Sequence, residues 1–328
     1  MSALDKSDLK FEISNLKPQI GIVVDAGPSL GYGHAVRCLR LANALADNTA
    51  VIVYPLSEIC RDFFLNASPA AKFEICETDW ETKEFPPLVI TDLRETHRIT
   101  GAIHRNGSRH ISIHDLGIAQ CGSDVVIDGS ITTLFPYKPD KNRSLFLGPQ
   151  YMVTREPVAR GELTDTVLVS FGGGSNSNFA LRASEEVWNC GLTPIQTRGF
   201  IGSSPITDEE VARAMATCRF AISSSGATLY DLLASGVPTL AVAFDRIQLR
   251  TADAFHERGA VISAGLVERL GPGALLRCSI EMLENPSMLE RLSQAGQMLV
   301  DGKGLSRVVE IVRRQLWLTS QEKTYSIY

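Results

Sequence analysis

The sequence predicts an α/β protein built from two Rossmann-like domains. Short apolar runs alternate with segments whose apolar residues recur every three or four positions, which is typical of parallel strands connected by helices. The order strand, glycine loop, helix occurs in residues 20–46 and again from Thr166 onward. With 328 residues, the chain is also long enough for about two domains. These observations favour two parallel sheets, each covered by helices.

The first of these junctions combines an apolar run, a glycine loop and a histidine. Residues 20–24 form the run, Gly31 and Gly33 lie in the loop, and His34 follows directly. The apolar residues after His34 fall on one face of a helix. Open α/β sheets bind ligands where such a strand ends, and the N-terminus of the helix favours an anion there.

Further strands and helices alternate along the chain. In the first half we expect strands at 51–54, 88–90, 110–114 and 125–127, and helices at 59–65 and 99–103. In the second half we expect strands at 166–171, 195–197, 200–202, 220–223 and 239–244, with helices from Phe179 and at 208–217, 228–235, 249–258, 272–284, 288–300 and 305–317. Residues 131–163 hold four prolines and little periodicity, which indicates a crossing between domains. The expected domains are therefore 18–150 and 151–318, with loose termini at 1–17 and 319–328.

Three aspartates close expected strands of the first half, namely Asp92, Asp115 and Asp128. Because the carboxyl ends of parallel strands meet at one crevice, these side chains are candidates for the same site as the first loop. Asp is equally common as the cap of a turn or helix. The sequence leaves the roles of these three aspartates open.

The composition excludes several classes of protein. A hydrophobic content of 44% with 21% charged residues is that of a globular chain, and the net charge of −5 provides no basic surplus for nucleic acid. None of the seven cysteines forms a C-x-x-C pair, as expected for reduced thiols in the cytosol. The N-terminus has no secretory signal pattern, and no stretch approaches the ~20 apolar residues that span a bilayer. A soluble cytoplasmic protein is expected.

His34 is the strongest candidate for catalysis. A lone histidine is more often structural, but the loop glycines permit close approach to a ligand and imidazole titrates near neutral pH. A neutral His34 can take a proton from water or from a sugar hydroxyl. His110 and His114 are four apart in a strand, which is not the helical spacing of a zinc pair, so no metal site is expected.

Residues 223–231 form a second strand–loop–helix junction and are a candidate nucleotide-binding site. Its helix begins with small residues whose backbone N–H groups can surround a diphosphate: Ser225, Gly226, Ala227 and Thr228. Asp231, one turn further on, can accept hydrogen bonds from a ribose diol. The alternative is a well-capped helix with an exposed carboxylate.

The loop 172–178 provides a second anion cradle, with Gly173, Gly174 and Asn176 as candidate nucleotide contacts. Its spacing is neither that of a Walker motif nor G-x-G-x-x-G. Kinase, ATPase and dinucleotide-dehydrogenase activities are therefore not favoured.

Four segments resemble the pseudaminic-acid-pathway UDP-sugar hydrolases. They are GYGHAVRCLRLANAL, VLVSFGGGSNSNF, ISSSGATLYDLLASGVPTLAVAF and DGKGLSRVV, in family order over nearly the whole chain. That family has a GT-B-like fold, similar to the lipid II-forming N-acetylglucosaminyltransferases, and hydrolyses UDP-2,4-diacetamido-2,4,6-trideoxy-β-L-altropyranose. Related proteins in spore-coat and surface-polysaccharide clusters share these motifs. Arg37 and Cys38 of GHAVRC favour the hydrolases over the transferases, whose loops resemble GGTGGH.

The resemblance implies a cleft between a sugar-facing N-terminal domain and a nucleotide-binding C-terminal domain. His34 is the implied catalytic residue, with Asp25 beside it in the loop, and Gly226 and Asp231 belong to the UDP site. The residues expected to face the sugar are Gly31, Tyr32, Gly33, Arg37, Asp92 and Gln248. The family usually has Glu at the position of Asp231 and Asn at that of Ile247, and its approach to the first loop is RADAS rather than DAGPSLGYGH. These departures affect the identity of the sugar more than the architecture.

The expected reaction is hydrolysis of a UDP-sugar by water attack at the anomeric carbon, with no cofactor. Such an enzyme belongs to surface-glycan or nonulosonic-acid biosynthesis. The first alternative is a GT-B glycosyltransferase, in which an acceptor hydroxyl replaces water. The second is a nucleotide-sugar binding protein without catalysis. Neither the sugar nor the oligomeric state follows from the sequence.

Overall fold

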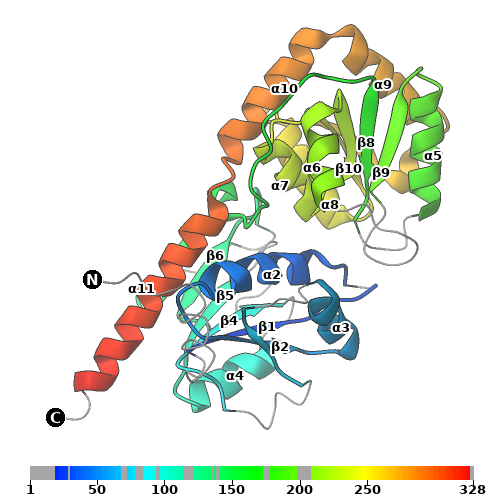
Figure 1. Cartoon of the computed structure of the whole chain (residues 1–328). Helices are drawn as coiled ribbons and strands as arrows, with labels where there is room; N and C mark the ends of the chain where they lie inside the picture. The colour runs from blue at the N-terminus through cyan, green and yellow to red at the C-terminus, as the bar shows by residue number, and fades with distance from the viewer. Residues whose placement is uncertain are drawn as a thin grey trace, which may run out of the picture.

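Two parallel sheets form the framework of the molecule (Figure 1). The computed structural model describes residues 19–28, 30–67, 72–77, 84–93, 97–113, 122–133, 136–137, 140–172, 177–197 and 208–325. The α/β class with two Rossmann-like sheets is confirmed. The expected strand 200–202 and Asp115 lie outside the described residues.

The N-terminal sheet has seven strands in the order β3-β2-β1-β4-β5-β6-β7. They are β1 (Ile20–Val24), β2 (Val51–Pro55), β3 (Glu74–Ile75), β4 (Leu88–Asp92), β5 (Arg109–Ile113), β6 (Val125–Asp128) and β7 (Ser144–Leu147), with helices α2 (Gly33–Leu45), α3 (Glu58–Ala67) and α4 (His97–Arg105). Every residue of β1 is buried, and alternate side chains serve opposite faces. Ile22 packs in the cluster of Leu41 on α2, whereas Val23 packs with Ile103 on α4. Apolar side chains on both faces explain the unbroken apolar run of this strand.

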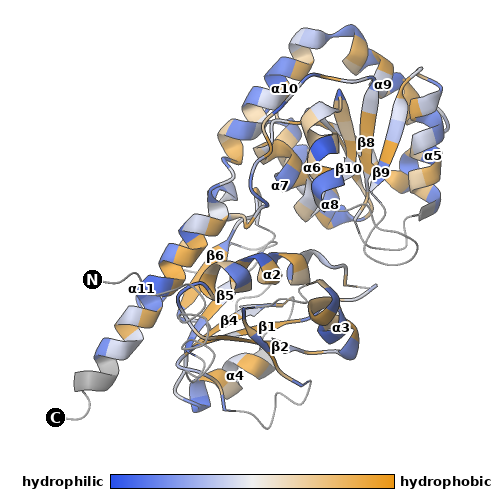
Figure 2. Cartoon of the chain, viewed as in Figure 1, coloured by the Kyte–Doolittle hydropathy of each residue, from blue (hydrophilic) through white to orange (hydrophobic). Residues whose placement is uncertain are grey.

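The C-terminal sheet has five strands in the order β12-β11-β10-β8-β9. They are β8 (Thr166–Ser170), β9 (Thr193–Thr197), β10 (Phe220–Ser224), β11 (Thr239–Ala243) and β12 (Ile262–Leu266). The helices are α5 (Ser177–Trp188), α6 (Asp208–Thr217), α7 (Ala227–Ala234), α8 (Arg246–His256), α9 (Ala274–Glu284) and α10 (Pro286–Leu299). Gly236 follows α7 with a φ of 66°, the left-handed conformation that ends many helices. Figure 2 shows apolar residues along the strands of both sheets.

Three strands of the described part of the chain, β3, β7 and β12, were not predicted from the sequence. β3 has only two residues, and β7 is an edge strand that pairs with β6 alone and stays partly exposed, so neither shows a clear apolar run. β12 contains Gly265 at a φ of 88°, where its register against β11 shifts. A bulge with glycine obscures the alternation by which a strand is predicted.

The last helix, α11 (Gly304–Tyr325), leaves the C-terminal domain and crosses the N-terminal sheet (Figure 1). Val308 and Val312 belong to the same apolar cluster as Ile22, and Arg109 Nε donates to Gln315 Oε1 at 2.7 Å. This helix therefore packs on the N-terminal domain, although it follows the C-terminal one in the chain. Among the described helices, none combines the length and apolarity needed to cross a membrane.

Candidate active site

Both sheets reverse their strand order next to the loops singled out in the sequence. The N-terminal chain runs outward from β1 to β2 and β3 and then returns to β4 beside β1, while the C-terminal chain runs from β8 to β9 and then places β10 on the other side of β8. Ligands of α/β sheets bind at such switch points. Helix α2 follows β1 and α7 follows β10, and a Cβ placed on Gly33 would lie 3.6 Å from the Cβ of Ala227. The N-termini of the two helices therefore meet between the domains.

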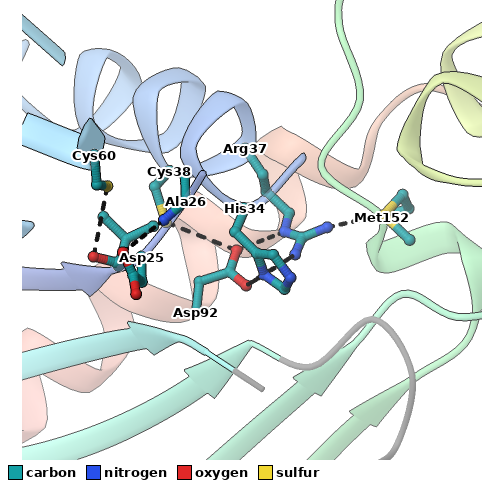
Figure 3. A network of polar contacts seen from close by, with 9 residues as sticks. Asp25, Ala26, His34, Arg37, Cys38, Cys60, Asp92 and Met152 are labelled. Carbon is teal, nitrogen blue, oxygen red and sulfur yellow. Dashed lines mark hydrogen bonds and ion pairs between the residues drawn. The ribbon is translucent and has the colours of Figure 1, made fainter. Parts of the chain in front are cut away.

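His34 is joined to Asp92 across the switch point (Figure 3). His34 lies in the first turn of α2 and is 8% exposed, and its Nδ1 is 2.7 Å from Asp92 Oδ1. Asp92 is the last residue of β4 and has no exposed surface. Because β1 pairs with β4 so that Val24 lies beside Asp92, the parallel register carries this carboxylate to the loop that holds His34.

Arg37 completes a buried charge network. Its Nε donates to Asp92 Oδ2 at 2.6 Å and one terminal nitrogen donates to Asp92 Oδ1 at 2.8 Å, an arrangement in which guanidinium and carboxylate face each other as two forks. Its other terminal nitrogen lies 3.9 Å from the sulfur of Met152 in the segment between the domains. Burial alone would raise the pKa of Asp92, but Arg37 and His34 outweigh burial and hold that pKa well below its usual range. Asp92 is therefore an anion.

This anion fixes the tautomer of His34. A contact of 2.7 Å between an imidazole nitrogen and a carboxylate requires a proton on that nitrogen, because two lone pairs at this distance would repel each other. Nδ1 thus carries the proton, and the approach of an Arg37 nitrogen to Nδ1 at 3.2 Å is a close contact rather than a hydrogen bond. In the neutral ring, Nε2 then carries the lone pair. The arrangement is that of a general base held by a carboxylate.

Asp25 belongs to a separate cluster beside this network. Its Oδ1 accepts the Ser57 hydroxyl at 2.6 Å and the backbone N–H of Ala26 at 2.9 Å. Burial and the nearby Asp25 carboxylate raise the pKa of the Cys60 thiol to about 12. The structure thus links Asp25 to the loop and to α3, whereas His34 is linked to Asp92.

The start of α7 is the most open part of the second junction. Gly226 caps the helix without a side-chain hydrogen bond, and a Cβ at Gly226 would meet no atom within 4 Å. Gly226, Ala227 and Thr228 are partly exposed, whereas Ser225 is buried and its hydroxyl donates to the carbonyl of Val242 at 3.1 Å. Because no side chain caps this helix start, its backbone N–H groups are available to an anion.

Asp231, on the second turn of α7, is bound to both the N-terminal domain and the linker. Arg40 of α2 donates to Oδ1 at 3.1 Å and to Oδ2 at 3.0 Å, and the backbone N–H of Arg155 donates to Oδ1 at 2.8 Å. The carboxylate that the sequence assigned to a ribose therefore already has donors in this structure. Arg40 was not singled out in the sequence, because its partner lies 191 residues away.

The other predicted site residues lie in several different places. Gly31 has a φ of 81° and forms a small bridge with Gly27, which closes the first loop; Tyr32 is buried with its ring against Phe63. Gln248 lies in the first turn of α8, where its Oε1 accepts the N–H of Phe244 at 3.3 Å. Gly173, Gly174 and Asn176 lie outside the described residues. Asp128 closes a turn by accepting the N–H of Ser130 at 2.9 Å and the Tyr137 hydroxyl at 2.7 Å, which is the capping alternative.

Comparison with known proteins reveals one distant relative in sequence. No family model matches the chain. The spore coat polysaccharide biosynthesis protein SpsG of Bacillus subtilis strain 168 is 24% identical over 334 residues, which cover 90% of this chain and 97% of that protein.

Solved structures share the fold at low sequence identity. Acinetobacter baumannii MurG matches with a TM-score of 0.65 at 13% identity, covering 90% of this chain and all of the other. The kitacinnamycin glycotransferase matches with a TM-score of 0.63 at 14% identity, covering 92% of this chain and 100% of that chain. The S. aureus MnaA–UDP structure matches with a TM-score of 0.62 at 12% identity, covering 92% of this chain and 98% of that chain. The chain is a distant homologue of SpsG and has the GT-B fold.

Proposed function

We propose that this protein hydrolyses a UDP-sugar to UDP and the free sugar, in the biosynthesis of a surface glycan. The observation that carries the proposal is the buried contact between His34 and Asp92 at the first switch point, beside the start of α7. A histidine held in one tautomer by a carboxylate is suited to remove a proton from water. The uncapped start of α7 is suited to an anionic leaving group.

The reaction follows from these two parts. Nε2 of His34 takes a proton from water as the water oxygen bonds to the anomeric carbon. The bond between that carbon and the phosphate oxygen breaks, and its electron pair leaves with UDP. The α7 backbone N–H groups stabilise the charge that develops on the diphosphate. Asp92 stabilises the imidazolium, which then returns its proton to solvent.

Most of the remaining residues keep the roles expected from the sequence, and these roles are part of the proposal. Asp231 is the proposed ribose acceptor, and Gly226, Ala227 and Thr228 are the proposed diphosphate contacts. Gly173, Gly174 and Asn176 are further nucleotide contacts proposed from the sequence alone. We assign Gly31, Gly33 and Gln248 to the sugar and Asp25 to ordering the loop. Tyr32 is buried against Phe63, so we assign it to supporting the loop. Arg37 and Asp92 are buried, so we assign them to positioning His34 rather than to direct contact with the sugar.

The comparisons support a nucleotide-sugar substrate, because proteins with this fold are named for UDP or for a UDP-sugar. One is a structure of MnaA with UDP, and another is a UDP-N-acetylglucosamine 2-epimerase from Listeria monocytogenes with a TM-score of 0.58. SpsG is named for polysaccharide biosynthesis. The resemblance of GHAVRC to the UDP-sugar hydrolases favours water as the acceptor. Glycosyltransferases with the same fold make transfer to a hydroxyl acceptor the second candidate.

Release of UDP from a panel of UDP-sugars, in ¹⁸O-labelled water and with or without acceptor sugars, tests the proposal. We expect the label in the free sugar, and a loss of about 10²–10⁴-fold in rate for His34→Gln. His104→Gln is the matched control, since His104 lies on α4 with a 41% exposed side chain. Equal rates for His34→Gln and wild type would reject the mechanism. Turnover only with an acceptor would identify a transferase, and binding without turnover a binding protein.

A further inference from the structure

We propose that Arg40 couples nucleotide binding to the contact between the two domains, because a ribose at Asp231 has to displace it. The proposal rests on the nucleotide site of the proposed function and adds its regulation. Arg40 lies on α2, which carries His34, and Asp231 lies on α7, which begins at the diphosphate site. The two helices belong to different sheets and face each other between the domains (Figure 1).

The pair has the geometry of a specific contact. Two guanidinium nitrogens of Arg40 reach the two oxygens of Asp231 at 3.1 and 3.0 Å, and only 24% and 11% of the two side chains are exposed. A bidentate pair fixes direction as well as distance. It therefore holds one face of α2 against α7 at a single register.

The ribose and Arg40 need the same atoms. A ribose diol binds a carboxylate by donating two hydroxyl hydrogens to its oxygens. Asp231 Oδ1 already accepts from the backbone of Arg155, and Arg40 occupies both Oδ1 and Oδ2. With one methylene between backbone and carboxylate, Asp231 has little freedom to turn toward a second partner. Binding of the diol thus requires Arg40 to leave.

The carboxylate stays oriented when Arg40 leaves. The Arg155 N–H still donates to Oδ1 at 2.8 Å, so the linker holds Asp231 in place. The contact that is lost is the one between α2 and α7. Occupancy of the nucleotide site therefore loosens the domain contact on the helix that positions His34.

Calorimetric titration with UDP and with 2′,3′-dideoxy-UDP tests the coupling. In Arg40→Met the ribose meets no competitor, so we expect UDP to bind about 3- to 10-fold more tightly than to wild type. Dideoxy-UDP lacks the diol and should bind both proteins equally. Arg40→Lys keeps the positive charge but loses the bidentate contact, so its affinity for UDP should increase less than that of Arg40→Met. It provides a second variant if Arg40→Met folds poorly. Arg313→Met, an exposed change on α11, is the charge control and should match wild type.

Each other outcome counts against the proposal in a recognisable way. Equal or weaker binding of UDP by Arg40→Met overturns it while the nucleotide site stands. Weaker binding of both nucleotides identifies Arg40 as a phosphate contact instead. Absence of binding of either nucleotide by wild type rejects the nucleotide site itself, and the proposed function with it.

Discussion

At the residue scale, the site depends on one buried carboxylate. Asp92 has no exposed surface, yet it serves both His34 and Arg37. A charge can remain in such a place only when its partners satisfy it. Asp92 therefore has two effects that can be measured separately, the orientation of His34 and the neutralisation of Arg37.

Replacement of Asp92 by Asn tests both effects. The amide removes the carboxylate that Arg37 contacts at 2.6 and 2.8 Å, so we expect a loss of about 3–5 kcal/mol in the free energy of unfolding, measured by urea titration. It also frees His34 to adopt the other tautomer, so UDP release should fall by about 10²–10⁴-fold. The double variant Arg37→Met/Asp92→Asn removes both members of the ion pair. It should recover most of the stability but none of the activity; recovery of activity would contradict the role of Asp92.

The same carboxylate gives the stability a defined pH dependence. Because the pKa of Asp92 is lower in the folded chain than in the unfolded one, its ionisation stabilises the fold at any pH above the unfolded value of about 3.9. This stabilisation is lost as the pH falls from there through the folded pKa. Urea titrations of wild type between pH 7 and 3 should show a steeper acid loss than those of Arg37→Met/Asp92→Asn. Parallel curves would mean that Asp92 is not the group responsible.

At the scale of elements, the junction before α11 is built on glycines. Gly302 has a φ of 71°, and a Cβ on Gly304 would overlap the backbone carbonyl of Met152. Arg307 pairs with Asp301 across this turn and donates to the carbonyl of Gln150 at 2.9 Å. The chain thus passes from the C-terminal to the N-terminal domain at the segment DGKGLSR. Gly304 in this segment allows the backbone of the linker at Met152 to approach closely.

Gly304→Ala should therefore destabilise the chain although alanine favours helices. The new methyl group meets backbone, which cannot turn aside, so we expect a loss of about 1–3 kcal/mol by thermal or urea unfolding. Gly161→Ala is the matched control, because a Cβ there would meet no atom within 4 Å. Its unfolding free energy should stay within about 0.5 kcal/mol of wild type. Equal effects of the two changes would disprove the close approach at Gly304.

The sequence predicted the local junctions better than the contacts between distant elements. Both strand–loop–helix units were recognised, because an apolar run, a glycine turn and a helical stripe are each encoded within about ten residues. The edge strand β7 and the bulged strand β12 lack that local pattern. His34 and Asp92 were each singled out, but their contact spans 58 residues and depends on the pairing of β1 with β4. Nothing in the local sequence marks Arg40, because its partner Asp231 lies 191 residues away on α7.

At the scale of the whole molecule, the two domains share the last helix. Val308 and Val312 of α11 pack in the N-terminal cluster, although the sequence range 151–318 assigned most of this helix to the C-terminal domain. The N-terminal sheet therefore lacks part of its apolar cover until α11 has been synthesised. We therefore expect folding of the first domain to depend on residues that follow the second.

This dependence predicts the behaviour of fragments. Residues 1–150 alone should unfold at lower urea concentration, or aggregate, because the face that α11 covers is exposed. The same fragment joined by a flexible linker to residues 304–325 should unfold cooperatively at higher urea concentration. A linked peptide with Val308→Asp and Val312→Asp is the control and should give no gain. Full stability of 1–150 alone would show that α11 contributes little.

Helix α2 carries His34, Arg37 and Arg40 at equal intervals of three residues, so the contacts of these side chains are mechanically linked. Arg37 is held by Asp92 at the midpoint, with His34 and Arg40 three residues to either side, about 4.5 Å along the axis at 1.5 Å per residue. Because α2 is one continuous helix, a tilt that moves Arg40 also strains the contact between His34 and Asp92. A misplacement of about 1 Å can change a reaction rate by about 10²-fold. If the proposed displacement of Arg40 takes place, we therefore expect it to change the rate at His34 as well as the affinity for the nucleotide.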